Sequence, residues 1–121
     1  MANTFKVANF AAEPASAGTP YVMYTIAGST TGVVLGLILT NIHTSAVTAE
    51  VELVSTTSNR SVANNASNGI SFLVKDVSIP AGSSLEILSG GKVVLETGDV
   101  LSIDCSVADK LSGTLSLMEI T

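Results

Sequence analysis

The 121-residue chain carries ten acidic and five basic residues, which gives a formal net charge of −5 at pH 7. Phosphate binding requires clustered Lys and Arg, but the five basic residues are scattered singly, so nucleic acid is excluded as a partner. The length fits one domain with one core. Hydrophobic residues make up 46% of the chain and aromatic residues 4%, so the core must come from aliphatic side chains, whose β-branched members favour strands.

The first segment, residues 1–20, is polar, rich in Ala, and contains Pro14 and Pro20. Two alternatives stay open for it. It is either a partner-binding arm, which adds a strand to a neighbour by β-augmentation, or an edge strand of the domain formed by residues 21–121. The segment has no apolar stretch of the kind found in secretory signals, so we expect synthesis in the cytosol.

Residues 21–55 contain three predicted strands. Tyr21–Ile26 is the first, and turn-forming residues end it. The next, residues 33–41, is apolar on both faces, so we predict a central strand that is covered on both sides. Its predicted faces are Val33, Leu35, Leu37 and Leu39 on one side, with Val34 and Ile38 on the other. Its longest apolar run, residues 32–39, is far too short to span a bilayer, which excludes a membrane-spanning segment.

The third strand, residues 46–55, alternates clearly between apolar and polar side chains. We expect the inward-facing side chains to be Val47, Ala49, Val51 and Leu53. The outward-facing ones should be Thr48, Glu50 and Glu52. A hairpin with the preceding strand through residues 41–46 is predicted. Residues 56–68 follow as an exposed loop, either a binding loop or a plain connector.

The rest of the chain alternates short apolar runs with turn formers. Strands are predicted at residues 70–79, 84–88, 92–96, 100–107 and 114–121. Pro80–Ser83 forms a turn, and the "SGG" of 89–91 and the "TGD" of 97–99 are predicted to be hairpin turns. About eight short strands without helical periodicity predict an all-β fold, an antiparallel β-sandwich or jelly roll.

Reactive constellations are sparse. Cys105 shares the phase of neighbouring apolar residues, which indicates a buried thiol, and His43 lies in a predicted loop. Glu50 and Glu52 point the same way from one strand and lack the facing carboxylate of a glycosidase. The aspartates match no calcium loop. We therefore expect no enzyme activity, no metal and no cofactor.

The stretch "IPAGSSLEILSGGKVVLETGDVLSI", together with the final "SLMEIT", resembles small virion structural proteins of tailed bacteriophages, notably those that infect cyanobacteria. The likeness covers residues 79–121. Upstream, "VMYTIAGSTTGVVLGLILTN" looks like the same family's strand, turn and strand, with Ala27 in place of the usual Pro. The shared residues are turn formers and core residues, so the resemblance implies a β fold and a place in the virion, not a position in the particle.

The resemblance implies a non-enzymatic coat component that is made in the host cytoplasm and resides in the virion. One placement is a head decoration (cement) protein that binds and stabilises the outer capsid lattice as a trimer or dimer. The other is a tail, neck or fibre-base component. A carbohydrate-binding module is a third hypothesis, disfavoured because the chain has no Trp and few aromatic residues.

Contacts with the capsid, tail proteins or other copies are expected at two places, the N-terminal segment and the loop at 56–68. The candidate interface residues are Thr4, Phe5, Lys6, Val7, Phe10, Asn59, Arg60, Asn64 and Asn65.

Overall fold

The computed structural model describes residues 2–55 and 69–121, and within these ranges the chain forms nine β-strands and no helix. The strands are β1 (Asn3–Glu13), β2 (Tyr21–Thr25), β3 (Thr31–Asn41), β4 (Val47–Val54), β5 (Ile70–Ile79), β6 (Ser84–Glu86), β7 (Val93–Leu95), β8 (Val100–Cys105) and β9 (Leu111–Ile120). The described part of the chain accordingly has no helix that could cross a membrane. The all-β prediction is confirmed.

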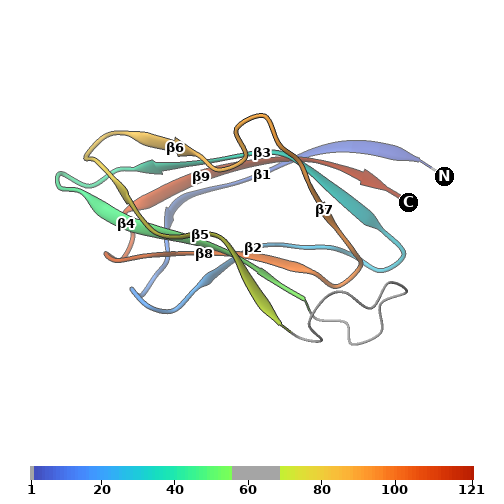
Figure 1. Ribbon diagram of the computed structural model, residues 1–121, viewed down its shortest axis with the longest axis horizontal. Coiled ribbons are helices and arrows are strands. Elements are labelled where there is room, and N and C mark those ends of the chain that lie inside the picture. The colour runs from blue at the N-terminus through green and yellow to red at the C-terminus, as the bar shows by residue number, and fades with distance from the viewer. Residues whose placement is uncertain (1, 56–68) are drawn as a thin grey trace.

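The strands form two sheets that pack face to face (Figure 1). Sheet A has the order β1-β9-β3-β6, with β7 also paired to β3, and sheet B has the order β2-β8-β4-β5. Both β6 and β7 run antiparallel to β3, at Ile38–Thr40 and at Gly32–Val34 respectively. These two short strands are therefore successive pieces of one interrupted edge strand.

The pairing is nested along the chain. β1 pairs with β9, β2 with β8, β3 with β6 and β7, and β4 with β5, all antiparallel. This is the pattern of one long hairpin folded over on itself, and it defines a jelly roll. Apart from β4–β5 and β6–β7, strands adjacent in sequence fall in opposite sheets. The predicted antiparallel β-sandwich is confirmed.

The nested pairing overturns the three predicted hairpins. β3 lies in sheet A and β4 in sheet B, so the chain crosses between sheets at residues 42–46 instead of turning back. The buried Asn41 stabilises this corner, because its Nδ2 donates to the carbonyls of Ser45 and Ile79 and its Oδ1 accepts from the amide of His43. "TGD" likewise joins β7 of sheet A to β8 of sheet B, and "SGG" joins the two collinear pieces β6 and β7.

The faces predicted for β3 are also wrong, because its pairing with β9 shifts between Val34 and Gly36. Such a bulge inserts one residue and exchanges the two faces beyond it. Val34, Leu37 and Leu39 are buried, whereas Leu35 and Ile38 are 37% and 44% exposed. Among the described residues nothing covers the second face, which the sequence led us to expect would be covered.

The core is aliphatic, as the composition predicts. Its fully buried large side chains come from both sheets and include Leu37, Leu39, Leu101, Ile103, Leu115 and Leu117. Phe10 adds a ring that lies 5.2 Å from the Tyr21 ring in an edge-to-face contact. Cys105 is a buried free thiol, and the inward row of β4 is buried at Val47, Ala49 and Val51, as predicted.

Gly113 leaves the space that the Phe10 ring fills. A Cβ at this position would lie 2.5 Å from Phe10 Cε1 and 3.1 Å from Leu39 Cδ2, whereas a Cβ at Gly36 would meet nothing within 4 Å. We expect Gly113→Ala to lower the free energy of unfolding by about 1–3 kcal/mol. Gly36→Ala, the matched control in the adjacent strand, should be neutral or slightly stabilising. Urea unfolding of both variants measures the difference, and equal stabilities would contradict the packing described.

Candidate interaction surface

The outer face of sheet A, the side away from sheet B, carries apolar side chains on β1, β9, β3 and β7, whereas β6 places Glu86 there. Because paired residues of antiparallel strands face the same way, the register defines its rows. One row crosses four strands: Phe5, Met118, Val33 and Val94. The next contains Val7, Ser116 and Gly36, with Leu35 beside them at the bulge. The third is Asn9, Thr114, Ile38 and Glu86.

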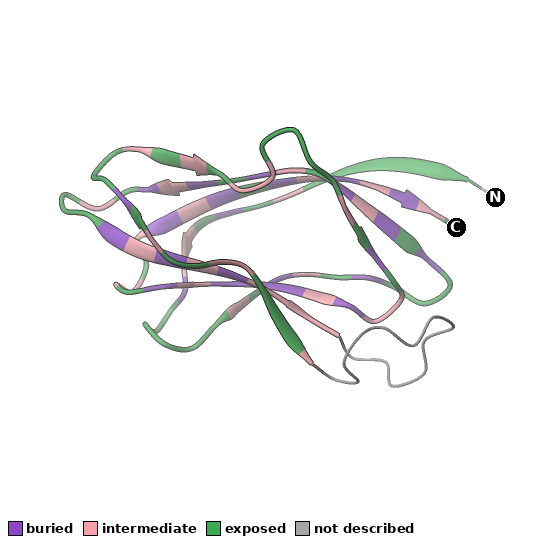
Figure 2. Ribbon diagram, viewed as in Figure 1, coloured by how far each residue is buried: buried purple, intermediate pink, exposed green. Residues whose placement is uncertain are grey.

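Several side chains of this outer face are strongly exposed. Phe5 is 74% exposed, Val7 68% and Val94 61%. Figure 2 shows the first part of β1 exposed, in contrast to the largely buried β9 beside it. Among the residues of the three rows, Glu86 at one corner is the one charged side chain. A monomer has no need of such a surface, and contiguous exposed apolar patches are typical of interaction sites.

A shallow groove of about 260 Å³ runs over β9 within this face. Phe5 and Val7 of β1 form one wall and Leu35 of β3 forms the other, with the small side chain of Ser116 between them. The groove exists because β9 presents a small residue where its neighbours present large ones. It gives the face a recess that an apolar side chain of another protein can enter.

On the inner side of the same strands, Glu119 links the two sheets. Its side chain is only 7% exposed, and it accepts a hydrogen bond from the Tyr24 hydroxyl at 2.6 Å and lies 2.7 Å from Lys6 Nζ. Lys6 and then Tyr24 lower the pKa of the Glu119 carboxyl. In turn the carboxylate raises the pKa of Lys6, and burial followed by the Glu119 hydrogen bond raises the pKa of Tyr24. The one charge of β1 between residues 3 and 12 is thus neutralised within the fold.

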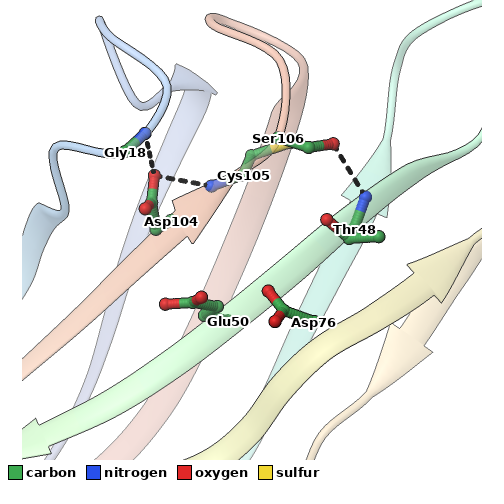
Figure 3. Close-up of a pocket in the computed structure, with 7 residues that line it drawn as sticks. All are labelled: Gly18, Thr48, Glu50, Asp76, Asp104, Cys105 and Ser106. Atoms are coloured by element: carbon green, nitrogen blue, oxygen red, sulfur yellow. Dashed lines mark hydrogen bonds between the residues drawn. The ribbon is translucent and has the colours of Figure 1, made fainter.

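The outer face of sheet B has a different character. Glu50 and Asp104 are directly paired across β4 and β8, and both line a polar pocket of about 180 Å³ with Asp76 (Figure 3). Asp104 Oδ1 accepts from the amides of Gly18 and Cys105. These bonds bind the loop before β2 to β8, so the pocket is part of the structural framework.

Glu50 and Glu52 both point outward from sheet B, as the alternation predicts. Glu50 Oε1 lies 2.9 Å from Lys75 Nζ, which also lies 4.5 Å from the centre of the Phe72 ring. Burial, followed by the charges of Glu50 and Asp104, raises the pKa of Glu52. Exposed apolar residues occur on this face too, but they are interleaved with these carboxylates.

The predicted interface residues fall into three groups. Phe5 and Val7 lie on the outer face of sheet A, while Thr4 and Lys6 alternate with them and point to the inner side. Phe10, expected at the interface, is only 9% exposed and belongs to the core. Asn59, Arg60, Asn64 and Asn65 lie outside the described residues.

Sequence reasoning missed the part of the surface that β3, β7 and β9 contribute. Val94, Leu35 and Met118 were assigned only to strands, and no partner contact was expected there. The available signal was the apolar character of both faces of β3 and the consecutive apolar residues Val93–Leu95.

The described residues offer little chemistry beyond binding. Within residues 2–55 and 69–121 no group of three or more His, Cys, Asp or Glu side chains could hold a metal ion. His43 lies in the crossover between β3 and β4, the loop position that was predicted, and Cys105 is buried.

The chain matches no protein-family profile, no curated protein and no solved structure.

The contacts of Glu119 with Lys6 and Tyr24 make the stability of the fold depend on pH in the acidic range. A carboxyl whose pKa is lowered by folding stabilises the fold fully above its unfolded pKa, and that stabilisation is lost as the pH falls through the folded pKa. We expect the melting temperature to drop below pH 4.5, the ordinary pKa of Glu119. Glu119→Gln should lower the free energy of unfolding by about 1–2 kcal/mol at neutral pH. It should also flatten the acid limb, which is the fall in melting temperature below pH 4.5.

Lys6→Gln should also flatten the acid limb, since Lys6 is the main cause of the lowered pKa of Glu119. Lys110→Gln, which changes a cation away from this pair, is the control. Thermal melts from pH 3 to 7 on the three variants test the link, and an unchanged acid limb in Glu119→Gln would contradict it.

On sheet B, Glu50→Gln and Glu52→Gln should differ in their effect on stability. The pKa of Glu52 is raised, so its ionised form opposes folding, and that cost grows as the pH rises through the folded pKa. Glu52→Gln should therefore stabilise the protein slightly at pH 7, by up to about 1 kcal/mol. Glu50→Gln removes the Lys75 pair and should be neutral or slightly destabilising. Thermal melts at pH 7 compare the two, and a marked loss in Glu52→Gln would reverse the interpretation.

Proposed function

We propose that the protein is a non-enzymatic structural protein of a tailed-phage particle, a head decoration protein that binds and stabilises the outer capsid lattice. The observation that carries this proposal is the exposed apolar patch on the outer face of sheet A, formed by Phe5, Val7, Leu35 and Val94. The sandwich already has a closed aliphatic core, so this face adds nothing to the folding of a monomer. It is suited to lie against another protein.

The energetics of the face fit a role in assembly. Each large apolar side chain contributes roughly 1.5–3 kcal/mol when fully buried, and Phe5, Val7 and Val94 are all more than 60% exposed. A single contact of this size is weak. On a particle the same contact is repeated many times, and copies that also associate with one another raise each other's effective concentration.

The phage assignment rests on resemblance, not on the face. Residues 79–121, which carry the virion-like pattern, begin at the last residue of β5 and include β6 to β9, so they supply strands to both sheets. Jelly rolls occur in viral capsid proteins and also in lectins and cupins, so the fold agrees with a virion role without selecting it.

The aromatic residues favour a structural role over a carbohydrate-binding module. Sugar sites use exposed aromatic platforms, but here Phe10 is buried and its ring packs against Tyr21. Phe5 and Phe72 are exposed on outer faces of different sheets, and Lys75 lies over the Phe72 ring. The described aromatic side chains form no shared platform.

Val94→Ser tests the docking face, with Val22→Ser as its matched control. Val94 is 61% exposed on β7 of sheet A, and Val22 is 54% exposed on β2 of sheet B. We expect Val94→Ser to weaken binding to phage particles that lack the protein by about tenfold, since a buried valine contributes about 1.5 kcal/mol. Val22→Ser should bind as the unaltered protein does. Cosedimentation with particles measures both.

Equal binding of the two variants would show that the apolar face is not the docking surface. The absence of any binding to heads would refute decoration, and the copy number in purified virions then decides the placement. A number that matches the capsid lattice supports decoration, whereas the number of a tail ring supports a tail component.

A further inference from the structure

The two sheets, as the described residues form them, end in four edge strands, and three of these carry features that prevent pairing with another chain. Natural edges are blunted by short strands, bulges and exposed charges. β2 has five residues and a register shift between Val22 and Tyr24. The β6–β7 edge is interrupted between Glu86 and Val93. β5 has two register shifts, and Lys75 is exposed on it.

β1 lacks these features over most of its length. Its register with β9 runs without a shift from Asn3 to Phe10. The one charged side chain in that stretch is Lys6, which points to the inner side and is paired with Glu119 at 2.7 Å. Inward-pointing charged residues can themselves guard an edge, because pairing there would bury the charge. Here the ion pair already neutralises it.

The hydrogen bonds at the chain ends fix which backbone groups of β1 face outward. Ala2 and Thr121 exchange both of their backbone hydrogen bonds, at 3.2 and 3.0 Å. Hydrogen-bonded pairs alternate along an antiparallel ladder, so Thr4, Lys6 and Ala8 also bond to β9. The N–H and C=O groups of the intervening residues therefore project from the free edge: Asn3, Phe5, Val7 and Asn9.

We propose that β1 pairs antiparallel with β1 of a second copy of this chain, joining two A sheets into one continuous sheet. An extended strand is the one partner that satisfies this row of alternating donors and acceptors. A second copy is favoured because the stretch carries no unpaired charge and a two-fold axis places the same residues on both sides. Depending on where the axis passes, exposed Phe5 or exposed Val7 then packs against its own counterpart in the other copy.

Charge also limits the register of the dimer. Centring the axis on Lys6 would set two lysines directly opposite each other, which is unfavourable even when each is paired. Among axes centred within residues 5–7, this leaves Phe5 and Val7, and we take these two registers as the proposed ones. Either register leaves the outer faces of both A sheets on the same side, so the dimer presents two docking faces to a lattice and gains avidity.

A proline at position 7 tests the pairing, because the N–H that it removes faces the free edge and not β9. Proline is tolerated on edge strands at such positions. The unaltered protein should sediment at twice the 12.3 kDa of the chain. Val7→Pro should raise the dissociation constant of the dimer by at least about tenfold. Val7→Ala, which keeps the N–H and loses most of the side chain, should raise it less, and both variants should melt cooperatively.

Residue-resolved hydrogen exchange tests the same pairing without a variant. Raising the protein concentration should protect the amides of Phe5 and Val7, while those of Lys6 and Ala8 are protected at all concentrations because they bond to β9. A monomer at all concentrations, a trimer, a Val7→Pro dimer of unchanged affinity, or no concentration dependence at Phe5 and Val7 would each overturn the proposal.

The Val94→Ser variant distinguishes a failure of the dimer proposal from a failure of the proposed function. Val94 lies on β7, three strands away from the free edge of β1. Val94→Ser should therefore remain a dimer while its binding to particles weakens. Loss of the dimer in Val94→Ser would place the self-association on the outer face and overturn the edge pairing.

Discussion

The position of β9 between β1 and β3 is the constraint on which sheet A depends. Its pairing joins Asn3 to Ile120 on one side and Thr31 to Ile120 on the other, so strands from both ends of the chain must meet before the sheet exists. Such non-local pairing costs loop-closure entropy before it gains contacts. The outer face of sheet A follows from it, because Phe5, Met118 and Val94 become neighbours only through β9 and β3.

Glu119 makes β9 the link between the layers as well. It lies on the inner side of sheet A, where its carboxylate bonds to Tyr24 of sheet B and to Lys6 of β1. A carboxylate this deeply buried is tolerable only with such partners. The ion pair has a consequence at the surface, because it draws the one charge of the first part of β1 inward. Both the outer face and the free edge of β1 are left without a bare charge.

The outer faces of the two sheets therefore differ in chemical character. Sheet B presents Glu50, Glu52 and Asp104 to solvent, and its polar pocket is held by hydrogen bonds that serve the fold. Sheet A presents apolar side chains, a groove and an unguarded edge. We interpret this asymmetry as that of an assembly subunit. The outer face of sheet B is polar and faces solvent, and the outer face of sheet A is the proposed docking surface. The proposed contacts use two different features of sheet A, its face for the lattice and its edge for a second copy.

The sequence by itself determined the all-β class, most strand positions and the inward row of β4, because alternation and turn formers are local signals. It could not determine which strands pair. The pattern of a hairpin and that of a crossover are alike where each strand is followed by a short turn, and only the buried amide of Asn41 distinguishes them at one corner. The bulge at Val34–Gly36, which turns Leu35 and Ile38 outward, is set by packing against β9. The apolar patch on the outer face of sheet A was hidden for the same reason, since its residues come from four strands and their neighbourhood depends on register, which only the tertiary structure decides.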